Sequence, residues 1–176
     1  MGLFFGIAVF TLVEDAALII WLLLVRAGQR VGGAATLIVG FFVEHVIAQK
    51  VKGGPVTGRI AGRIGVNAVV ETVVWVVWLL LWPISRIAAT AWLYATLVVE
   101  HSLTDNIFHD RPLFSHLLNR HVLGFTALET VGSTAWLAFV DAGRAAIGIA
   151  FLVVFQYAEH ARAIALGRRP VNSLRD

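Results

Sequence analysis

The chain has no cysteine, so disulfide bonds and thiolate metal ligands are both excluded. Charged residues are scarce as well: they make up 14% of the chain, whereas a soluble domain usually carries about 25%. The lysines and arginines form no patch or stripe, so the net charge of +3 does not indicate nucleic-acid binding. The sequence is instead 59% hydrophobic with a mean hydropathy of +0.81, which is typical of an integral membrane protein.

Six apolar segments approach or exceed the length that a membrane-spanning helix needs, which is ~20 residues. Turn-forming stretches rich in glycine, proline or charge separate them. The first segment lacks a basic leader and a small-residue cleavage site, so we interpret it as a retained helix and not a signal peptide. We therefore expect an all-α integral membrane protein with a single membrane domain over residues 1–176. Its expected helices are 3–25, 34–50, 65–82, 84–104, 121–140 and 143–166.

The basic residues predict the orientation of this chain in the membrane. Six spans put both termini on one side, together with ten of the lysines and arginines, and leave four on the other side. Because cytoplasmic loops carry the excess of basic residues, we expect both termini of a multi-pass cell-membrane protein to be cytoplasmic. The ten are residues 50, 52, 59, 63, 111, 120, 162, 168, 169 and 175, and the four are residues 26, 30, 86 and 144.

Six glutamates, one in each apolar segment, indicate an internal repeat. In each odd-numbered segment a tryptophan follows the glutamate by seven residues, and in each even-numbered segment a histidine follows it directly. The odd-to-even intervals are 30, 29 and 30 residues, and successive odd glutamates are 57 and 58 residues apart. We interpret this spacing as three tandem helix hairpins with pseudo-threefold symmetry, over 3–50, 65–104 and 121–166. The pairs are Glu14/Trp21, Glu71/Trp78 and Glu129/Trp136, and Glu44–His45, Glu100–His101 and Glu159–His160.

All six glutamates are expected near the middle of the ~30 Å hydrocarbon core. Polar groups in membrane helices face the bundle interior, so we expect the carboxylates to converge on one axis. No lysine or arginine lies at the depth of the glutamates to compensate their negative charge. The repulsion among the carboxylates must therefore be relieved by protonation or by bound metal ions. Mixed carboxylate and imidazole donors suit iron, manganese or zinc better than calcium or magnesium. We predict two or three divalent ions, iron or manganese before zinc, bound by Glu14, Glu44, His45, Glu71, Glu100, His101, Glu129, Glu159 and His160.

The donor inventory resembles that of ferritin-like di-iron and di-manganese carboxylate proteins. Those proteins use one glutamate from each of two helices and a Glu-x-x-His motif from each of two others. The resemblance is limited to the donor count, because here each glutamate and histidine are adjacent and about 100° apart around the helix. This spacing predicts that the glutamate points inward while the histidine reaches sideways to a neighbouring hairpin.

Other polar residues near the glutamates are expected to orient the ligands or to meet a substrate. They are Asp15, Asn67, Gln156 and Tyr157. The indoles of Trp21, Trp78 and Trp136 should share the helix face of the glutamates, ~10 Å nearer the non-cytoplasmic side. They would form either a dry plug over the site or an aromatic belt at the membrane interface. His109, His116 and His121 cluster near the fourth connection with Asp105 and Asp110, where solvated loop histidines are more expected than a second metal site.

Three functions are consistent with this inventory. The first is a redox metalloenzyme that acts on a lipophilic substrate such as a quinone, an alkyl chain or an isoprenoid. The second is a channel or transporter for protons or divalent cations that uses the Glu/His ring as its ion site. The third is a structural subunit of a larger membrane complex. Up to nine donors around a few ions favour retention over conduction, because a conducting site must release its ion.

Overall fold

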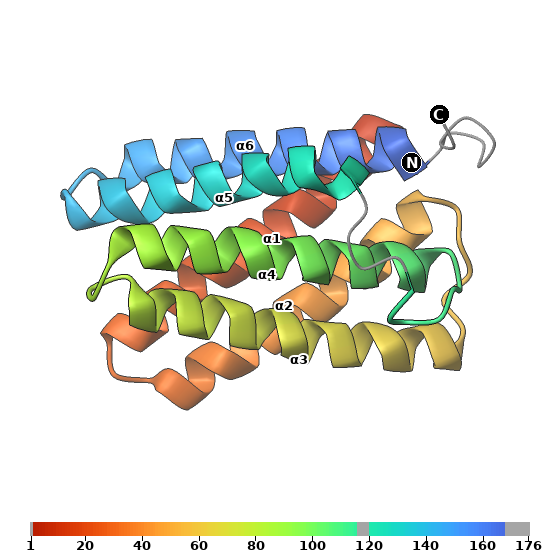
Figure 1. Cartoon of the computed structure of the whole chain (residues 1–176), viewed down its shortest axis with the longest axis horizontal. Coiled ribbons are helices and arrows are strands. Elements are labelled where there is room, and N and C mark those ends of the chain that lie inside the picture. The colour runs from red at the N-terminus through yellow and green to blue at the C-terminus, as the bar shows by residue number, and fades with distance from the viewer. Residues whose placement is uncertain (1, 116–119, 168–176) are drawn as a thin grey trace.

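The computed structural model describes residues 2–115 and 120–167, and these residues form six helices and no strand. The helices are α1 (Leu3–Arg26), α2 (Arg30–Val51), α3 (Gly58–Leu81), α4 (Arg86–Phe108), α5 (Arg120–Asp141) and α6 (Ala145–Gly167). They run nearly antiparallel along one long bundle (Figure 1). Consecutive helices pack against each other, and α6 also packs against α1, so the helix contacts close into a ring.

Five helices are long and apolar enough to cross a membrane: α1, α2, α3, and the parts of α5 and α6 over Val122–Asp141 and Ala145–Ala165. The chain is therefore a multi-pass membrane protein by the length and composition of its helices. Helix α4 is long enough but less apolar, because its second half carries Glu100, His101 and a run of polar residues up to Asn106. Those groups lower its hydropathy while lying largely inside the bundle.

Two helices begin earlier than their sequences predict. Helix α3 was expected from residue 65 but begins at Gly58, because the Thr57 side chain accepts a hydrogen bond from the backbone N–H of Ile60 at 3.3 Å. Helix α2 was expected from residue 34 but begins at Arg30. Gly28 takes a φ of +81° and ends α1, so the α1–α2 turn needs only three residues.

The connections divide the bundle into two ends. The turns α1–α2, α3–α4 and α5–α6 lie at one end, hereafter the hairpin end (Figure 1). The start of α1, the end of α6, the α2–α3 connection and the end of α4 lie at the opposite end, hereafter the terminal end. At the hairpin end Asp141 of α5 accepts hydrogen bonds from Arg26 of α1 and from the Trp82 indole beyond α3, both at 2.7 Å. This contact joins the ends of the three odd-numbered helices.

The largest apolar cluster of the core contains a group of fully buried tryptophans. Trp21, Trp75, Trp78 and Trp136 are each at most 1% exposed and belong to one cluster with leucines of α1, α2, α4, α5 and α6. Trp78 packs edge-on against Trp75 and Trp82, with ring centroids 5.3 and 5.7 Å apart. Burial of this kind contradicts an interfacial belt for Trp21, Trp78 and Trp136, since belt residues face the lipid headgroups.

Candidate metal centre

The six glutamates are all buried, each between 2% and 5% exposed, although every one lies on a helix that also has a lipid-facing side. Burial of the acids follows from the cost of placing a charged group against hydrocarbon. Among the residues whose side chains the structure describes, no lysine or arginine forms an ion pair with any glutamate. Five arginines pair instead with Asp105, Asp110 and Asp141 near the bundle ends. Lys52, which follows α2, interacts electrostatically with Asp105 and also with Glu159 and Glu44.

Each histidine of a Glu-His pair reaches the odd-numbered helix that follows it around the ring. His160 of α6 places Nε2 3.0 Å from Glu14 of α1, and His101 of α4 places Nε2 2.9 Å from Glu129 of α5. His45 of α2 is more distant, with Nδ1 3.9 Å from Glu71 of α3. The sideways reach expected from the adjacent Glu-His spacing is therefore present at all three inter-hairpin contacts.

Two groups of three side chains have donor atoms close enough to share one ion. They are Glu14, Glu44 and His160, and His45, Glu71 and Glu100, and within each group the ligand atoms lie within 4.8 Å of one another. A third combination also joins the two glutamates of one hairpin to the histidine of the hairpin before it. In this combination His101 Nε2 lies 2.9 Å from Glu129 and 3.9 Å from Glu159. The structure thus brings six of the nine sequence-predicted ligands into the two groups that could each share an ion, and Glu129, Glu159 and His101 lie near one another outside those groups.

Threonine hydroxyls orient two of the three imidazoles. Thr11 hydrogen-bonds Nδ1 of His160 at 2.8 Å, and Thr126 hydrogen-bonds Nδ1 of His101 at 2.7 Å. These bonds occupy the ring nitrogen that faces away from the glutamate, which fixes the imidazole and leaves Nε2 for an ion. Sequence reasoning missed both threonines. The signal was present, because each stands three residues before an odd-helix glutamate.

The third imidazole has different partners, because Ala68 occupies the position three residues before Glu71. His45 contacts the backbone oxygen of Phe41 through Nδ1 at 2.8 Å and the Thr104 hydroxyl through Nε2 at 3.0 Å. Asn67 donates to Glu100 at 2.6 Å and lies 3.3 Å from His45 Nε2. This part of the site is therefore built from more hydrogen bonds between protein groups than the other two.

The remaining polar residues singled out in the sequence have distinct surroundings. Gln156 donates to Glu14 at 2.8 Å, as expected of a residue that orients a ligand. Both carboxylate oxygens of Asp15 and one of Glu71 are buried without a hydrogen-bond partner within the described part of the chain. Tyr157 packs against the apolar cluster formed by Ile7, Phe10, Ala48 and Ile164.

The fourth connection is organised by ion pairs. His109 lies 3.1 Å from Asp105, and this hydrogen bond raises the pKa of the imidazole above its usual range. Asp110 pairs with Arg59 and with Arg63, which holds the pKa of the Asp110 carboxyl below its usual range. A salt-bridge network therefore accounts for the described polar residues here. His116 and the His121 side chain lie outside the described part of the structure.

The buried donor set could hold metal ions. It combines carboxylate oxygens with imidazole nitrogens, and within the described part of the chain it has carboxylate oxygens without hydrogen-bond partners and no lysine or arginine in ion-pair contact. No protein-family model, curated protein or solved structure matches the chain. Its function consequently has to follow from this arrangement of buried acids and histidines.

Proposed function

We propose that this protein is a membrane metalloprotein whose Glu/His ring holds two or three iron, manganese or zinc ions and carries out redox chemistry on a lipophilic substrate. The observation that supports it is the cyclic contact pattern. Each histidine lies between the glutamate of its own helix and the odd-helix glutamate of the next hairpin, and no lysine or arginine whose side chain the structure describes forms an ion pair with a glutamate.

Pseudo-threefold symmetry of three tandem hairpins explains this pattern. Each set combines both glutamates of one hairpin with the histidine of the hairpin before it in the ring. Applying the rule three times generates Glu14–Glu44–His160, Glu71–Glu100–His45 and Glu129–Glu159–His101. The closed ring of helix contacts and the meeting of α1, α3 and α5 at Asp141 support the same symmetry. We therefore assign repeats over 3–50, 65–104 and 121–166 of one membrane domain.

Electrostatics supports metal over an empty ring of acids. Six carboxylates in a low-dielectric interior repel one another strongly unless positive charge compensates them. Two or three divalent ions supply four to six positive charges, which matches the six acids. Carboxylate–imidazole sites of this kind hold ions that exchange electrons or polarise bound oxygen atoms.

The roles of the protein groups follow from their contacts. The glutamates supply negative oxygen donors, and the histidines supply neutral nitrogen donors, from Nε2 in His101 and His160. Thr11 and Thr126 hold two of the imidazoles in the required orientation, and Gln156 does the same for Glu14. A site enclosed by apolar helices excludes water, which suits a substrate that arrives from the bilayer.

Metal content of the full chain, purified in detergent without added metal, tests the proposal. We expect about two or three ions of iron, manganese or zinc per chain by elemental analysis. Glu129→Gln keeps the shape of the side chain but removes one charged donor, so it should lower the content by about one ion. Asp110→Asn is the matched control, because Asp110 pairs with Arg59 and Arg63 outside the ring and should leave the content unchanged.

An empty protein that remains folded as a helical bundle would contradict the metal proposal. The six acids would then have to be compensated by protons, and the Glu/His ring would fit a transporter or channel for protons or divalent cations better. Reconstituted vesicles loaded with a pH-sensitive or metal-sensitive dye would test that function directly.

A further inference from the structure

The interface between α1 and α6 carries a polar pair that the proposed metal ligands do not include. Thr11 of α1 hydrogen-bonds His160 of α6 at 2.8 Å, and the two helices pack against each other in opposite directions (Figure 1). Asp15 follows Thr11 by four residues, so it lies one helical turn nearer the hairpin end on the same face of α1. Gln156 precedes His160 by four residues and takes the corresponding place on α6. The register of the interface therefore places Asp15 opposite Gln156.

The oxygen atoms of this pair have no hydrogen-bond donor. Asp15 is 2% exposed and Gln156 is 0% exposed. Both carboxylate oxygens of Asp15 and Oε1 of Gln156 lack a partner within the residues that the structure describes. The amide nitrogen of Gln156 is already engaged, because it donates to Glu14 at 2.8 Å. A group of buried acceptors without a donor costs free energy unless a cation or a proton lies among them.

Asp15 also lacks a counter-charge of its own. It is the thirteenth of the 24 residues of α1 and therefore lies near the bilayer centre, where an unpaired carboxylate is costly. Its electrostatic interactions are an attraction to His160 and repulsions from Glu129 and Glu14. His160 Nε2 is already close to two other acids, at 3.0 Å from Glu14 and 3.1 Å from Glu159. A bound cation would compensate the charge that this histidine leaves unpaired.

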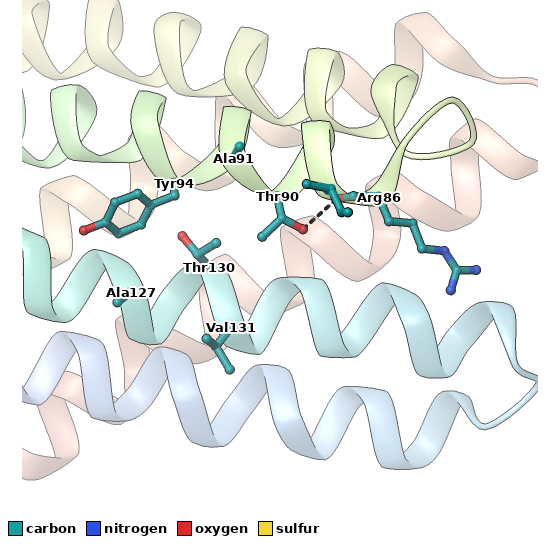
Figure 2. Close-up of a pocket in the computed structure, with 8 residues that line it drawn as sticks. Arg86, Thr90, Ala91, Tyr94, Ala127, Thr130 and Val131 are labelled. Atoms are coloured by element: carbon teal, nitrogen blue, oxygen red, sulfur yellow. Dashed lines mark hydrogen bonds between the residues drawn. The ribbon is translucent and has the colours of Figure 1, made fainter.

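The other two inter-hairpin interfaces lack such a pair. The residue after the odd-helix glutamate is Thr72 in α3 and Thr130 in α5. The residue four before the histidine is Phe41 in α2 and Leu97 in α4. Thr130 lies on the side of α5 that faces α4 (Figure 2), as Asp15 lies on the side of α1 that faces α6. The acceptor pair is therefore a property of the α1–α6 interface and does not belong to the repeated Glu-His pattern.

We infer that Asp15 and Gln156 form a binding site for a hard cation, separate from the three Glu/His combinations. Asp15 supplies carboxylate oxygens, and Gln156 supplies Oε1 while its amide nitrogen holds Glu14. Oxygen ligands suit calcium, magnesium or sodium, whereas imidazole nitrogen suits transition metals. The ion neutralises Asp15 and links α1 to α6, so its binding stabilises the folded protein.

Thermal unfolding of the full-length protein in detergent tests this site, with calcium, magnesium or sodium chloride added in turn. We expect at least one of the three ions to raise the unfolding midpoint by about 5–10 °C at about 100-fold its Kd. Choline chloride at equal ionic strength should leave the midpoint unchanged, because its cation is too large for the site. Asp15→Asn keeps the shape of the side chain, removes its charge and adds a donor for Gln156, so it should abolish the shift.

Two further variants complete the test. Gln156→Leu introduces the residue that α4 has at the corresponding position, and it should abolish the shift even if Asp15→Asn does not fold. Thr130→Val is the matched control on α5 and should retain the shift. A midpoint that none of the three ions raises would overturn the proposal, because Asp15 would then be protonated and donate to Gln156. A shift that survives Asp15→Asn or Gln156→Leu would overturn it as well, because the ion would bind elsewhere.

The result can be separated from that of the proposed function. Elemental analysis of the same samples for iron, manganese and zinc reports on the Glu/His ring, whereas the midpoint shift and its loss in Asp15→Asn report on the α1–α6 interface. An absence of those three metals together with a shift that depends on Asp15 would contradict the proposed function and support the hard-cation site.

Discussion

At the scale of single residues, the three histidines show how hydrogen bonding to one ring nitrogen decides whether the other is available to a ligand. A neutral imidazole has two nitrogens, and the partner of one decides the availability of the other. Thr11 and Thr126 occupy Nδ1 of His160 and His101, whereas both nitrogens of His45 contact other protein groups. We therefore expect the Glu71–Glu100–His45 set to bind metal least readily.

The threonine contacts lead to a prediction for metal retention. Thr126→Val removes the hydroxyl that holds His101. Loss of such an orienting bond typically lowers metal affinity about 10- to 100-fold, and we expect the low end of this range, about tenfold. The measurement is the metal that remains after dialysis against graded chelator. Thr96→Val serves as the control, because Thr96 donates to the Trp92 carbonyl away from the site. Equal retention in the two variants would show that Thr126 does not orient a ligand.

His109 gives a prediction for the pH dependence of stability. Its pKa is raised in the folded protein by the hydrogen bond to Asp105, so the protonated form is favoured by folding. The stabilisation is fully present below the unfolded pKa of about 6.5 and is lost as pH rises through the raised folded value. The free energy of unfolding of the unmodified protein, measured relative to that of His109→Gln, should fall by up to about 1 kcal/mol between mildly acidic and alkaline pH.

Thermal unfolding at several pH values checks this expectation. The difference in midpoint between the unmodified protein and His109→Gln should shrink as the pH rises. A difference that grows with pH would mean that the Asp105–His109 pair does not stabilise the fold.

At the scale of helices, small residues allow the hairpin partners to approach closely. A Cβ added at Gly148 of α6 would lie 2.7 Å from the backbone oxygen of Trp136 on α5, closer than Cβ atoms are found in practice. A Cβ added at Gly132 of α5 would lie 2.5 Å from Phe155 Cβ. Close approach at glycine is a main source of helix association in membranes, where hydrophobic burial contributes little.

Gly148→Ala should therefore separate α5 from α6. We expect the free energy of unfolding to fall by ~1–3 kcal/mol, the usual cost of an overpacked contact. The obstructing atom is a backbone oxygen, which cannot move aside as a flexible side chain can. Gly62→Ala on α3 is the control: nothing lies within 4 Å of its added Cβ, so helix propensity should keep it neutral or stabilising. Unfolding midpoints in detergent micelles measure both. Equal midpoints would mean that the two helices can separate without cost.

At the scale of the whole molecule, we expect the buried tryptophans to control access to the Glu/His ring. Trp21, Trp78 and Trp136 fill the core on the hairpin side of the glutamates. We predict that they close this route to water. Trp136→Ala should then speed the loss of metal to a water-soluble chelator added on that side by several-fold.

Two controls keep the access experiment interpretable. Trp92→Ala removes an indole that is 36% exposed and should leave the rate unchanged. Helical content must be measured as well, since truncation of a buried tryptophan typically costs 3–5 kcal/mol. An unaltered rate in a folded Trp136→Ala protein would assign the tryptophans a packing role only.

The orientation of the bundle in the membrane is open to a direct test, because the chain has no cysteine of its own. Lys50→Cys introduces one exposed thiol at the terminal end, and Ala142→Cys introduces one at the hairpin end. The excess of basic residues predicts that an impermeant thiol reagent added outside intact cells labels Ala142→Cys and not Lys50→Cys. The reverse pattern would place the termini outside the cell.

The sequence alone determined that six helices form and that their glutamates are buried. Both results follow from the bilayer, which demands ~20 apolar residues per span and penalises exposed charge, so they need no knowledge of the neighbouring helices. The adjacent Glu-His spacing also indicated the sideways reach of His45, His101 and His160, because the angle between consecutive side chains is a property of the helix itself.

Only the tertiary structure decided which groups meet across helices. The hydrogen bonds of Thr11 and Thr126 to histidines and the burial of Trp21, Trp78 and Trp136 depend on the rotation and distance of neighbouring helices. Rotation and distance are set by packing at small contacts such as Gly148 against Trp136. Helix periodicity places a residue on a face, but the helix that covers that face determines whether the residue contacts another polar group, packs in the core or faces the lipid.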